Sequence, residues 1–449
     1  MTHNLKDNAD DIVALCKRYT LFSWAAQGKV NPIPVTRAKG VYFWDAAGKR
    51  YLDFSSQLMN VNIGHGDPRV LEAITAQAAE LTYAYPGMAT RPRGELGRKL
   101  SELTPGGPKR TFFTLGGAEA IENAMKIARL YTGRQKIVTR YRSFHGGTFA
   151  AASAGGDPRR LANEPGVPWI VRTLDPYAYR SPIYRHCTPE EGDMVLIDLL
   201  AEQLEMEGPG NVAAVLLEGY SGSSGIMAPS TPLYWQRLRE LCTAHGILLI
   251  VDEVMSGFGR TGKWFAIEHY GVQPDLMVLA KGLTSGYLPL GAVVVNENIA
   301  AHFDQHELVA GLTYGAHTLA CATALACISV YEQDHLVERA AHLGKKLEVK
   351  LQRLQEHHPS LGDIRGTGLF YVLEVVKDRA TREPMSAWNK PLTPPMAAIA
   401  AYLREHGVST FVRWNLIFVV PPLIIEEQEL DEGLSVIDQA LAISDRAMA

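Results

Sequence analysis

Four apolar runs of strand length constrain the fold of this chain more than any other feature. They cover Ala213–Leu217, Ile247–Val251, Leu276–Leu279 and Ala292–Val295. None alternates apolar with polar residues, as a strand with one solvated face does, so we expect each strand to be buried on both faces. Helical periodicity lies between several of them, for example over Leu233–His245. The pattern predicts an α/β fold with helices flanking a mainly parallel sheet.

The two ends of the chain have a different pattern of apolar and polar residues from this central part. Val41–Asp45 and Tyr51–Phe54 flank a short turn and predict a β-hairpin. A long helical tract over Thr318–His357 is followed by mixed strands and helices. We therefore predict a large domain over residues 65–325. We expect a smaller α+β domain that both chain ends build together. Residues 1–64 would form an N-terminal arm and one part of this domain, and residues 326–449 would form its other part.

Charge and cysteine content exclude several classes of protein. The formal net charge is −4 and no long basic run occurs, so the sequence predicts no nucleic-acid partner. The polar, acidic start is unlike a signal peptide, and the longest apolar runs are too short to span a bilayer. The 5 cysteines form no C-x-x-C pair, which argues against a disulfide framework or a metal site. We expect a cytoplasmic protein without a bound metal or a membrane partner.

Lys281 stands directly after a predicted buried strand and Ala280, and before Gly282. Ligands of open α/β sheets bind beyond the carboxyl ends of the strands. A lysine in that position can form an imine with an aldehyde when its amine is neutral. Taken alone, a surface lysine just past a strand explains this feature better.

Two further features favour a bound cofactor. Asp252 ends another buried strand, where a carboxylate needs a partner. The protonated ring nitrogen of pyridoxal 5′-phosphate (PLP) can be that partner. The alternative is that Asp252 only caps a helix or turn. The segment Gly116-Gly117-Ala118 joins a strand to a helix, so its backbone N–H groups can attract a phosphate. Glycines in such a place often serve only to turn the chain.

The order of these motifs matches a known family. Along the chain stand Gly116-Gly117-Ala118, then Phe144-His145-Gly146, then DEVMSGFGRTG over residues 252–262, and finally Lys281-Gly282. This set resembles the class III aminotransferases, which are PLP enzymes of fold type I, and the resemblance covers nearly the whole chain. It implies a homodimer or a dimer of dimers with shared active sites.

The resemblance also implies a role for each matching residue. Lys281 would hold the cofactor as a Schiff base and move the substrate proton, and Asp252 would pair with the ring nitrogen. Val254 and Phe144 would pack on the two faces of the ring. The implied cofactor-binding set is Gly116, Gly117, Ala118, Phe144, His145, Glu218, Asp252, Val254, Lys281 and Thr313, the last reaching the phosphate of the neighbouring subunit.

Three positions depart from the pattern of many relatives. Gly116-Gly117-Ala118 stands where Ser-Gly-Ser is common, so two hydroxyls are lost, each worth about 1 kcal/mol as a hydrogen bond. Phe144 stands where tyrosine is common, and His317-Thr318 replaces a His-Pro pair. None of these changes removes the chemistry.

Three residues bear on the substrate. Arg413 resembles the mobile arginine of the ω-amino-acid and amine branches, although a surface arginine is the alternative. Leu58 and Met59 would line the substrate entrance, where a flexible methionine widens the pocket. These segments look closest to taurine:pyruvate enzymes.

We therefore expect an aminotransferase that moves an amino group from an ω-amino acid or primary amine to pyruvate or a similar 2-keto acid by a ping-pong mechanism. A PLP-dependent racemase, decarboxylase or aminomutase uses the same lysine and aspartate and stays open, as does a non-catalytic metabolite-binding protein.

Overall fold

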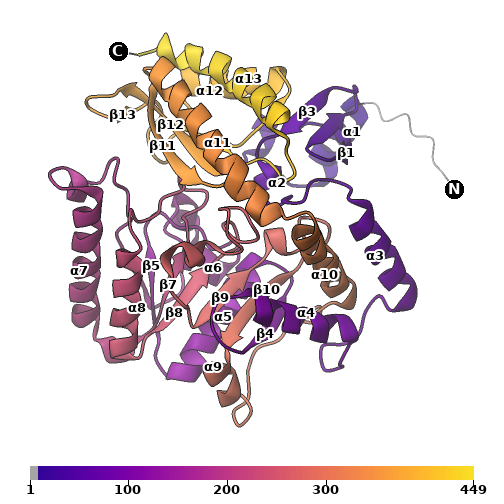
Figure 1. The fold of residues 1–449 in the computed structure, drawn as a ribbon, viewed down its shortest axis with the longest axis vertical. Helices are drawn as coiled ribbons and strands as arrows, with labels where there is room; N and C mark the ends of the chain where they lie inside the picture. Colours follow the sequence, from indigo (N-terminus) through magenta and orange to yellow (C-terminus); the bar gives the residue numbers. More distant parts are fainter. Residues whose placement is uncertain (1–8, 449) are drawn as a thin grey trace.

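The computed structural model describes residues 9–448 and has a seven-stranded sheet at its centre (Figure 1). Its strand order is β4-β10-β9-β8-β7-β5-β6. The strands are β4 (Lys109–Thr114), β5 (Lys136–Arg140), β6 (Ile170–Thr173), β7 (Val212–Glu218), β8 (Leu248–Asp252), β9 (Leu276–Leu279) and β10 (Gly291–Asn296). Neighbouring strands from β9 to β6 run parallel, and β10, which pairs antiparallel with both β4 and β9, runs opposite to the other strands of this sheet. The predicted α/β class with a mainly parallel sheet is confirmed.

Burial on both faces explains why the central strands lack alternation. Every residue of β7 and β8 is buried. Leu217 and Val251 join one core cluster with Trp235 of α8 (Leu233–His245). Leu216 and Ile250 point the other way and join a second cluster, which contains Ile121, Met125 and other residues of α5 (Gly117–Thr132). Each strand side chain therefore needs to be apolar whichever face it occupies.

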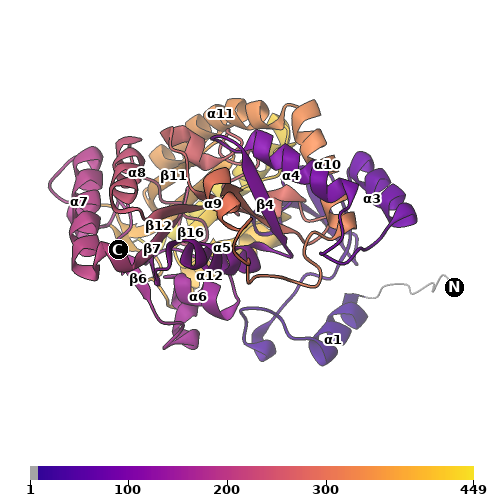
Figure 2. The same ribbon diagram turned by 90° about the horizontal axis from the view of Figure 1, so that it is seen from below.

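Further helices surround this sheet. They are α3 (Pro68–Glu80), α4 (Arg91–Leu103), α6 (Phe149–Ala154), α7 (Pro189–Glu207), α9 (Glu297–His302) and α10 (Thr318–Gln333). Figure 2 shows α7 beside α8 at one edge of the molecule and α3 with α10 at the other. In α7, Thr188 and Glu191 form a reciprocal capping box that satisfies N-terminal N–H groups.

The two chain ends come together in a second region (Figure 1). A four-stranded sheet joins β1 (Val35–Lys39), β2 (Tyr42–Asp45) and β3 (Arg50–Asp53) to the distant β14 (Val408–Ser409). A further sheet contains β11 (Leu361–Thr367), β12 (Phe370–Asp378), β13 (Glu383–Pro384), β15 (Val412–Arg413) and β16 (Leu416–Val419). The remaining helices are α1 (Ala9–Tyr19), α2 (Ser56–Met59), α11 (Leu336–His357), α12 (Pro394–Glu405) and α13 (Glu427–Asp445). This pairing agrees with a small domain built from both ends, while the exact boundaries at residues 64 and 325 stay a prediction.

The tract expected to be helical over Thr318–His357 is two helices. The break falls at His335, which has a positive φ of 49° and starts α11 after the end of α10. Asp334 is tied to Arg69 of α3 by an ion pair of 2.7 Å. A left-handed residue cannot continue a right-handed helix, so the chain changes direction here. Among the described residues, no helix is both long and apolar enough to cross a membrane.

Candidate active site

A cavity of about 370 Å³ opens where the central strands end. Because β7, β8 and β9 are parallel, their carboxyl ends meet at one edge, and the segments that follow β4 and β5 reach the same place. The lining residues are Asn60, Leu115, Gly116, Gly117, Ala118, Phe144, His145, Gly146, Glu218, Tyr220, Asp252, Val254, Met255, Ala280, Lys281, Thr284, Gly286, Leu288, Pro289 and Leu290. A cavity of this size suits a cofactor or small ligand.

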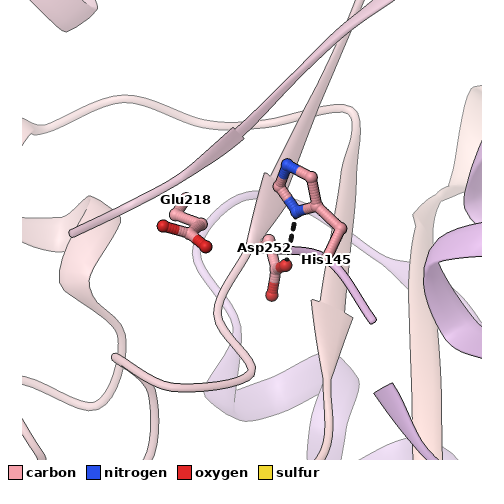
Figure 3. Close-up of side chains that lie close together, drawn as sticks. All are labelled: His145, Glu218 and Asp252. Carbon is pink, nitrogen blue, oxygen red and sulfur yellow. Dashed lines mark hydrogen bonds and ion pairs between the residues drawn. The ribbon is translucent and has the colours of Figure 1, made fainter. Parts of the chain in front are cut away.

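The buried side chains of His145, Glu218 and Asp252 lie close together (Figure 3) and line the cavity; together with Lys281 they form what we call its floor. Asp252 and Glu218 are cross-strand neighbours at the ends of β8 and β7. Oδ2 of Asp252 lies 2.8 Å from Nδ1 of His145, and its Oδ1 accepts the backbone N–H of Val254 at 3.0 Å. Asp252 therefore caps a turn, as the alternative to cofactor binding predicts, and it also positions the imidazole ring of His145.

Glu218 is satisfied by the backbone. Its two carboxylate oxygens accept the N–H groups of Phe144 at 3.0 Å and of Gly222 at 2.7 Å. The pKa of Glu218 is raised to about 7, because burial raises it most and the charge of Asp252 also raises it, while His145 opposes the rise. Glu218 therefore connects the segment that carries Phe144 to the end of β7.

The three side chains could also be interpreted as a metal site. Ligand atoms of His145, Glu218 and Asp252 lie within 4.8 Å of one another. However, the histidine and aspartate bond directly to each other, and the glutamate is engaged by backbone N–H groups. The cluster is held together by its own hydrogen bonds, so its geometry does not call for an ion, and the absence of a metal stays a prediction.

Lys281 enters the cavity from the segment after β9. Its backbone has a positive φ of 45°, an unusual conformation for a residue with a side chain and one that is common at functional sites. The pKa of its amine is lowered to about 8, because burial lowers it most and the charge of Arg159 also lowers it, while the charges of Asp252 and Glu218 oppose the shift. A larger fraction of the amine is therefore neutral near pH 7 than in an exposed lysine, which prepares it to attack a carbonyl carbon.

The start of α5 offers free backbone donors. Gly116 is the N-cap and no side chain caps this helix, whereas Thr188 caps α7. The first N–H groups of a helix have no partner within it, and here they border the cavity at Gly117 and Ala118. A Cβ atom on Gly117 would approach the side chain of Val254 to 3.1 Å, so the glycine also lets the helix start lie close to the floor.

Comparison with known proteins identifies the family. Residues 24–441 match the description of class-III aminotransferases. The chain belongs to this family. A probable aminotransferase of Mycobacterium tuberculosis is 37% identical over 91% of this chain and 89% of its own length. A taurine–pyruvate aminotransferase of Bilophila wadsworthia is 34% identical over 96% of both chains. The structure of a taurine:2-oxoglutarate aminotransferase from Bifidobacterium kashiwanohense, in complex with PLP and glutamate, is 39% identical, with a TM-score of 0.94 over 98% of this chain and 99% of its own.

Class-III aminotransferases are PLP enzymes, and the cavity fits that cofactor. Nε2 of His145 is buried without a hydrogen-bond partner among the described residues, so the floor retains an unused polar atom. The uncapped start of α5 offers donors for a phosphate, and the lysine with a lowered pKa lies in the same cavity. Each group that a phosphorylated pyridine aldehyde requires is therefore present.

The structure brings most of the residues predicted for this class-III aminotransferase site to one cavity. Those that line it are Gly116, Gly117, Ala118, Phe144, His145, Glu218, Asp252, Val254 and Lys281. Their individual roles stay proposals. The sequence reasoning missed other lining residues, including Tyr220, Met255 and Thr284. Tyr220 and Met255 lie two and three residues beyond predicted strand-end acids, so proximity to those acids was an available signal.

Four predicted residues lie away from the described cavity lining. Leu58 is 44% exposed, and Met59 is buried in an apolar cluster with Phe370, Trp414 and others. Residues 56–59 all have positive φ values between 46° and 68°, so this entrance turn is left-handed. Ser56, the first residue of this turn, is held in place because its Oγ donates a hydrogen bond to the carbonyl of Val420 at 2.7 Å. The expected place of both side chains at the substrate entrance stays a prediction.

Thr313 and Arg413 complete the set. Thr313 is exposed and borders a separate hollow with Tyr85 and Phe112, where its carbonyl accepts the hydroxyl of Tyr83 at 2.8 Å. An exposed position is what a residue serving a neighbouring subunit requires, and that role stays a proposal. Arg413 contacts Asp157 at 2.8 Å, close to the loop that follows β7.

Proposed function

We propose that this class-III aminotransferase transfers the amino group of an ω-amino acid or primary amine to pyruvate or a similar 2-keto acid. The observation that carries the proposal is the single cavity that combines Lys281, Asp252 and the uncapped start of α5. PLP supplies an electrophilic aldehyde and a ring that withdraws electrons when it is protonated. The two substrates use this cavity in turn, which is a ping-pong mechanism.

The residues of the cavity would hold the cofactor and move the substrate proton. Lys281 would hold the cofactor through its amine and could then move a proton of the substrate carbon. Asp252 would place its carboxylate beside the ring nitrogen, and His145 holds that carboxylate in position through the 2.8 Å contact. The N–H groups of Gly117 and Ala118 would hold the phosphate, and Phe144 and Val254 would pack against the ring.

The substrate class rests on relatives and on Arg413. The similar proteins include one named for taurine with pyruvate and one for taurine with 2-oxoglutarate, so an ω-amino acid as donor is favoured. The guanidinium of Arg413 is suited to bind the carboxylate or sulfonate of such molecules. Pyruvate stays our proposed acceptor. The alternative acceptor is 2-oxoglutarate, because the similar enzyme from Bifidobacterium kashiwanohense is named for it.

An absorbance experiment tests both half-reactions. The visible band of the bound cofactor is recorded before and after adding taurine or a primary amine, and again after adding pyruvate or 2-oxoglutarate. We expect the band to bleach with the donor and to return with pyruvate. A return only with 2-oxoglutarate corrects the acceptor, and activity confined to α-amino acids contradicts the proposed donor class. If no amine changes the absorbance band, the racemase, decarboxylase or aminomutase alternatives are favoured.

Assembly and location complete the proposal. We infer a homodimer or dimer of dimers, because Thr313 is exposed and borders a separate hollow instead of the cavity that contains Lys281. A cytoplasmic location is inferred from the five unpaired cysteines of the sequence. Sedimentation of the purified enzyme tests the first inference.

A further inference from the structure

The four residues of α2 form a turn with left-handed backbone conformations. Residues 56–59 have φ values of 46°, 49°, 68° and 56°, and none of them is a glycine. Each such residue is strained, because its Cβ atom crowds the following carbonyl oxygen. The backbone N–H of Asn60 closes the turn by donating to the carbonyl of Ser56 at 2.8 Å. Backbone strain of this kind persists only where the surroundings hold it, and it clusters at functional sites.

Asp53, the last residue of β3, holds the start of this left-handed turn. Its side chain is fully buried, and its Oδ1 accepts the backbone N–H groups of Gln57 at 3.1 Å and of Ser55 at 3.4 Å. Its Oδ2 accepts Nε2 of Gln57 at 3.3 Å and lies 3.1 Å from Nε2 of His65. As at the start of a helix, the first N–H groups of a turn lack partners within it. The carboxylate of Asp53 therefore satisfies donors that the turn itself leaves free.

Two asparagines follow the turn, and their side-chain amides have different surroundings. The amide of Asn62 is engaged on both sides, because its Nδ2 donates to the carbonyl of Phe258 at 3.1 Å and its Oδ1 accepts from Arg260 at 2.7 Å. Asn60 lines the cavity, and among the described residues no hydrogen bond holds its side-chain amide. A Cβ atom on Gly286 would lie 3.0 Å from Nδ2 of Asn60, so this glycine leaves room for the amide. The amide of Asn60 is therefore free for a ligand.

Few other polar side chains of the cavity are free for a substrate. The four side chains of the floor would serve the cofactor, and the hydroxyl of Thr284 donates to the carbonyl of Leu288 at 2.5 Å. Asn60 and Tyr220 are the polar lining residues that remain. The amide of Asn60 offers two N–H donors, against the single O–H of Tyr220. Such donors suit the oxygens of a carboxylate or sulfonate.

We propose that Asn60 determines specificity by donating a hydrogen bond from its side-chain amide to the acid group of the substrate, and that Asp53 is the positioning residue that aims this amide. The inference rests on the proposed function, since the acid group is the carboxylate or sulfonate of the donor and acceptor. Asn60 directly follows the left-handed turn. A turn that relaxes to an ordinary backbone conformation therefore moves the amide away from the cavity, and the hydrogen bonds of Asp53 prevent this relaxation.

Binding of propionate to the holoenzyme tests the role of Asn60 without turnover. Propionate has an acid group but no amino or keto group, so it is an unreactive probe, and isothermal titration calorimetry gives its Kd. We expect Asn60→Ala to weaken propionate binding about tenfold, because a hydrogen bond to a charged group is lost. Asn60→Asp should weaken it further, since a second carboxylate then faces the probe. In turnover, the KM of the keto acid should rise by a similar factor while kcat changes little.

A double-mutant cycle tests the role of Asp53. Asp53→Ala should weaken propionate binding about as much as Asn60→Ala, and the double variant should bind no more weakly than either single variant, because Asp53 acts through Asn60. A merely structural role would lower the stability of the fold without this coupling. Asp193→Ala is the matched control. Asp193 is also a buried carboxylate, bonded to the hydroxyl of Tyr184 and the backbone N–H of Ser230 at 2.6 Å each, and it lies outside the cavity lining. Propionate binding should be unchanged in this control.

A milder variant keeps the test decisive if Asp53→Ala does not fold. Asp53→Asn retains one carbonyl oxygen for the backbone N–H of Gln57, so it should weaken propionate binding about threefold. Unchanged propionate binding in Asn60→Ala, or no binding of propionate to the unchanged enzyme, overturns the role of Asn60. Additive losses in the double variant overturn the role of Asp53. A wrong assignment of donor or acceptor leaves these propionate shifts intact, so failure of the proposed function is distinguishable from failure of this inference.

Discussion

The floor of the cavity and the ion pair between Asp157 and Arg413 are built in different ways. On the floor, Asp252, Glu218 and Lys281 stand at or just beyond the ends of adjacent parallel strands, and the register of the sheet fixes their positions. The ion pair joins a loop to a two-residue strand far away in the sequence, and Asp157 also accepts hydrogen bonds from Arg159. The residues proposed for the chemistry common to all substrates are therefore positioned by the sheet, whereas Arg413, proposed for substrate binding, is held by side-chain contacts between distant segments.

Lys281→Ala should give the largest effect and abolish turnover with every donor, a loss of roughly 10⁴-fold or more. The floor serves all substrates, so donors with and without an acid group should fail alike. Steady-state rates over an amine panel measure this, with the exposed Lys345→Ala as control. Measurable turnover of the Lys281→Ala variant with any one donor contradicts the proposed role of Lys281.

Asp252→Asn should keep the fold and lower the rate by about 10²- to 10³-fold, because the negative charge beside the ring nitrogen is lost. The factor should be the same for taurine and for an amine without an acid group. Circular dichroism checks the fold and kcat for each donor checks the factor. Near-normal rates contradict the role of the carboxylate, and a factor that depends on the donor shows that the floor does not act equally on all substrates.

The pH dependence of cofactor attachment connects the two regions. Only the neutral amine of Lys281 attacks the aldehyde, and its pKa is about 8, so the rate at which apoenzyme takes up PLP should rise with pH through about 8. Asp252 raises that pKa and Arg159 lowers it. The midpoint should therefore move to lower pH in Asp252→Asn and to higher pH in Arg159→Gln. Stopped-flow absorbance measures it, and a midpoint unmoved in both variants excludes this electrostatic link.

Glu218 should leave a smaller signature in the stability of the apoenzyme. Burial raises its pKa from 4.5 to about 7, so the folded state binds more protons than the unfolded state between these values. The contribution is complete below pH 4.5 and is lost as pH rises through about 7, on the order of 3 kcal/mol at most. Glu218→Gln should flatten the fall of the unfolding midpoint in urea between pH 5 and about 7. An unchanged slope contradicts the shift; the buried Glu253, whose pKa is also about 7, offers a comparison variant.

The same contrast explains what the sequence could predict. Asp252, Glu218 and Lys281 follow apolar runs, and strand ends of a parallel sheet converge, so one-dimensional patterns place them together. The cluster of Asp157, Arg159 and Arg413 has no such pattern, because it depends on how a loop and β15 fold over each other. Arg413 was singled out only through resemblance, and Asp157 and Arg159 were missed.

The fold shows the same limits. The buried central strands were predicted within a residue or two, since their composition reports burial on both faces. Strand β5 and the edge strand β6 were missed because Lys136–Arg140 and Ile170–Thr173 mix charged and apolar residues. The break at His335 depends on a positive φ that nothing in its helical surroundings indicates.

The most direct test of the central claim is to locate the cofactor attachment. The holoenzyme is treated with borohydride, which adds hydride to the carbon–nitrogen double bond and makes the link permanent, and its peptides are analysed by mass spectrometry. We predict the added mass of the reduced cofactor on the peptide that contains Lys281 and on no other. Attachment at a different lysine, or no covalent attachment in protein that retains the cofactor band, would contradict the account.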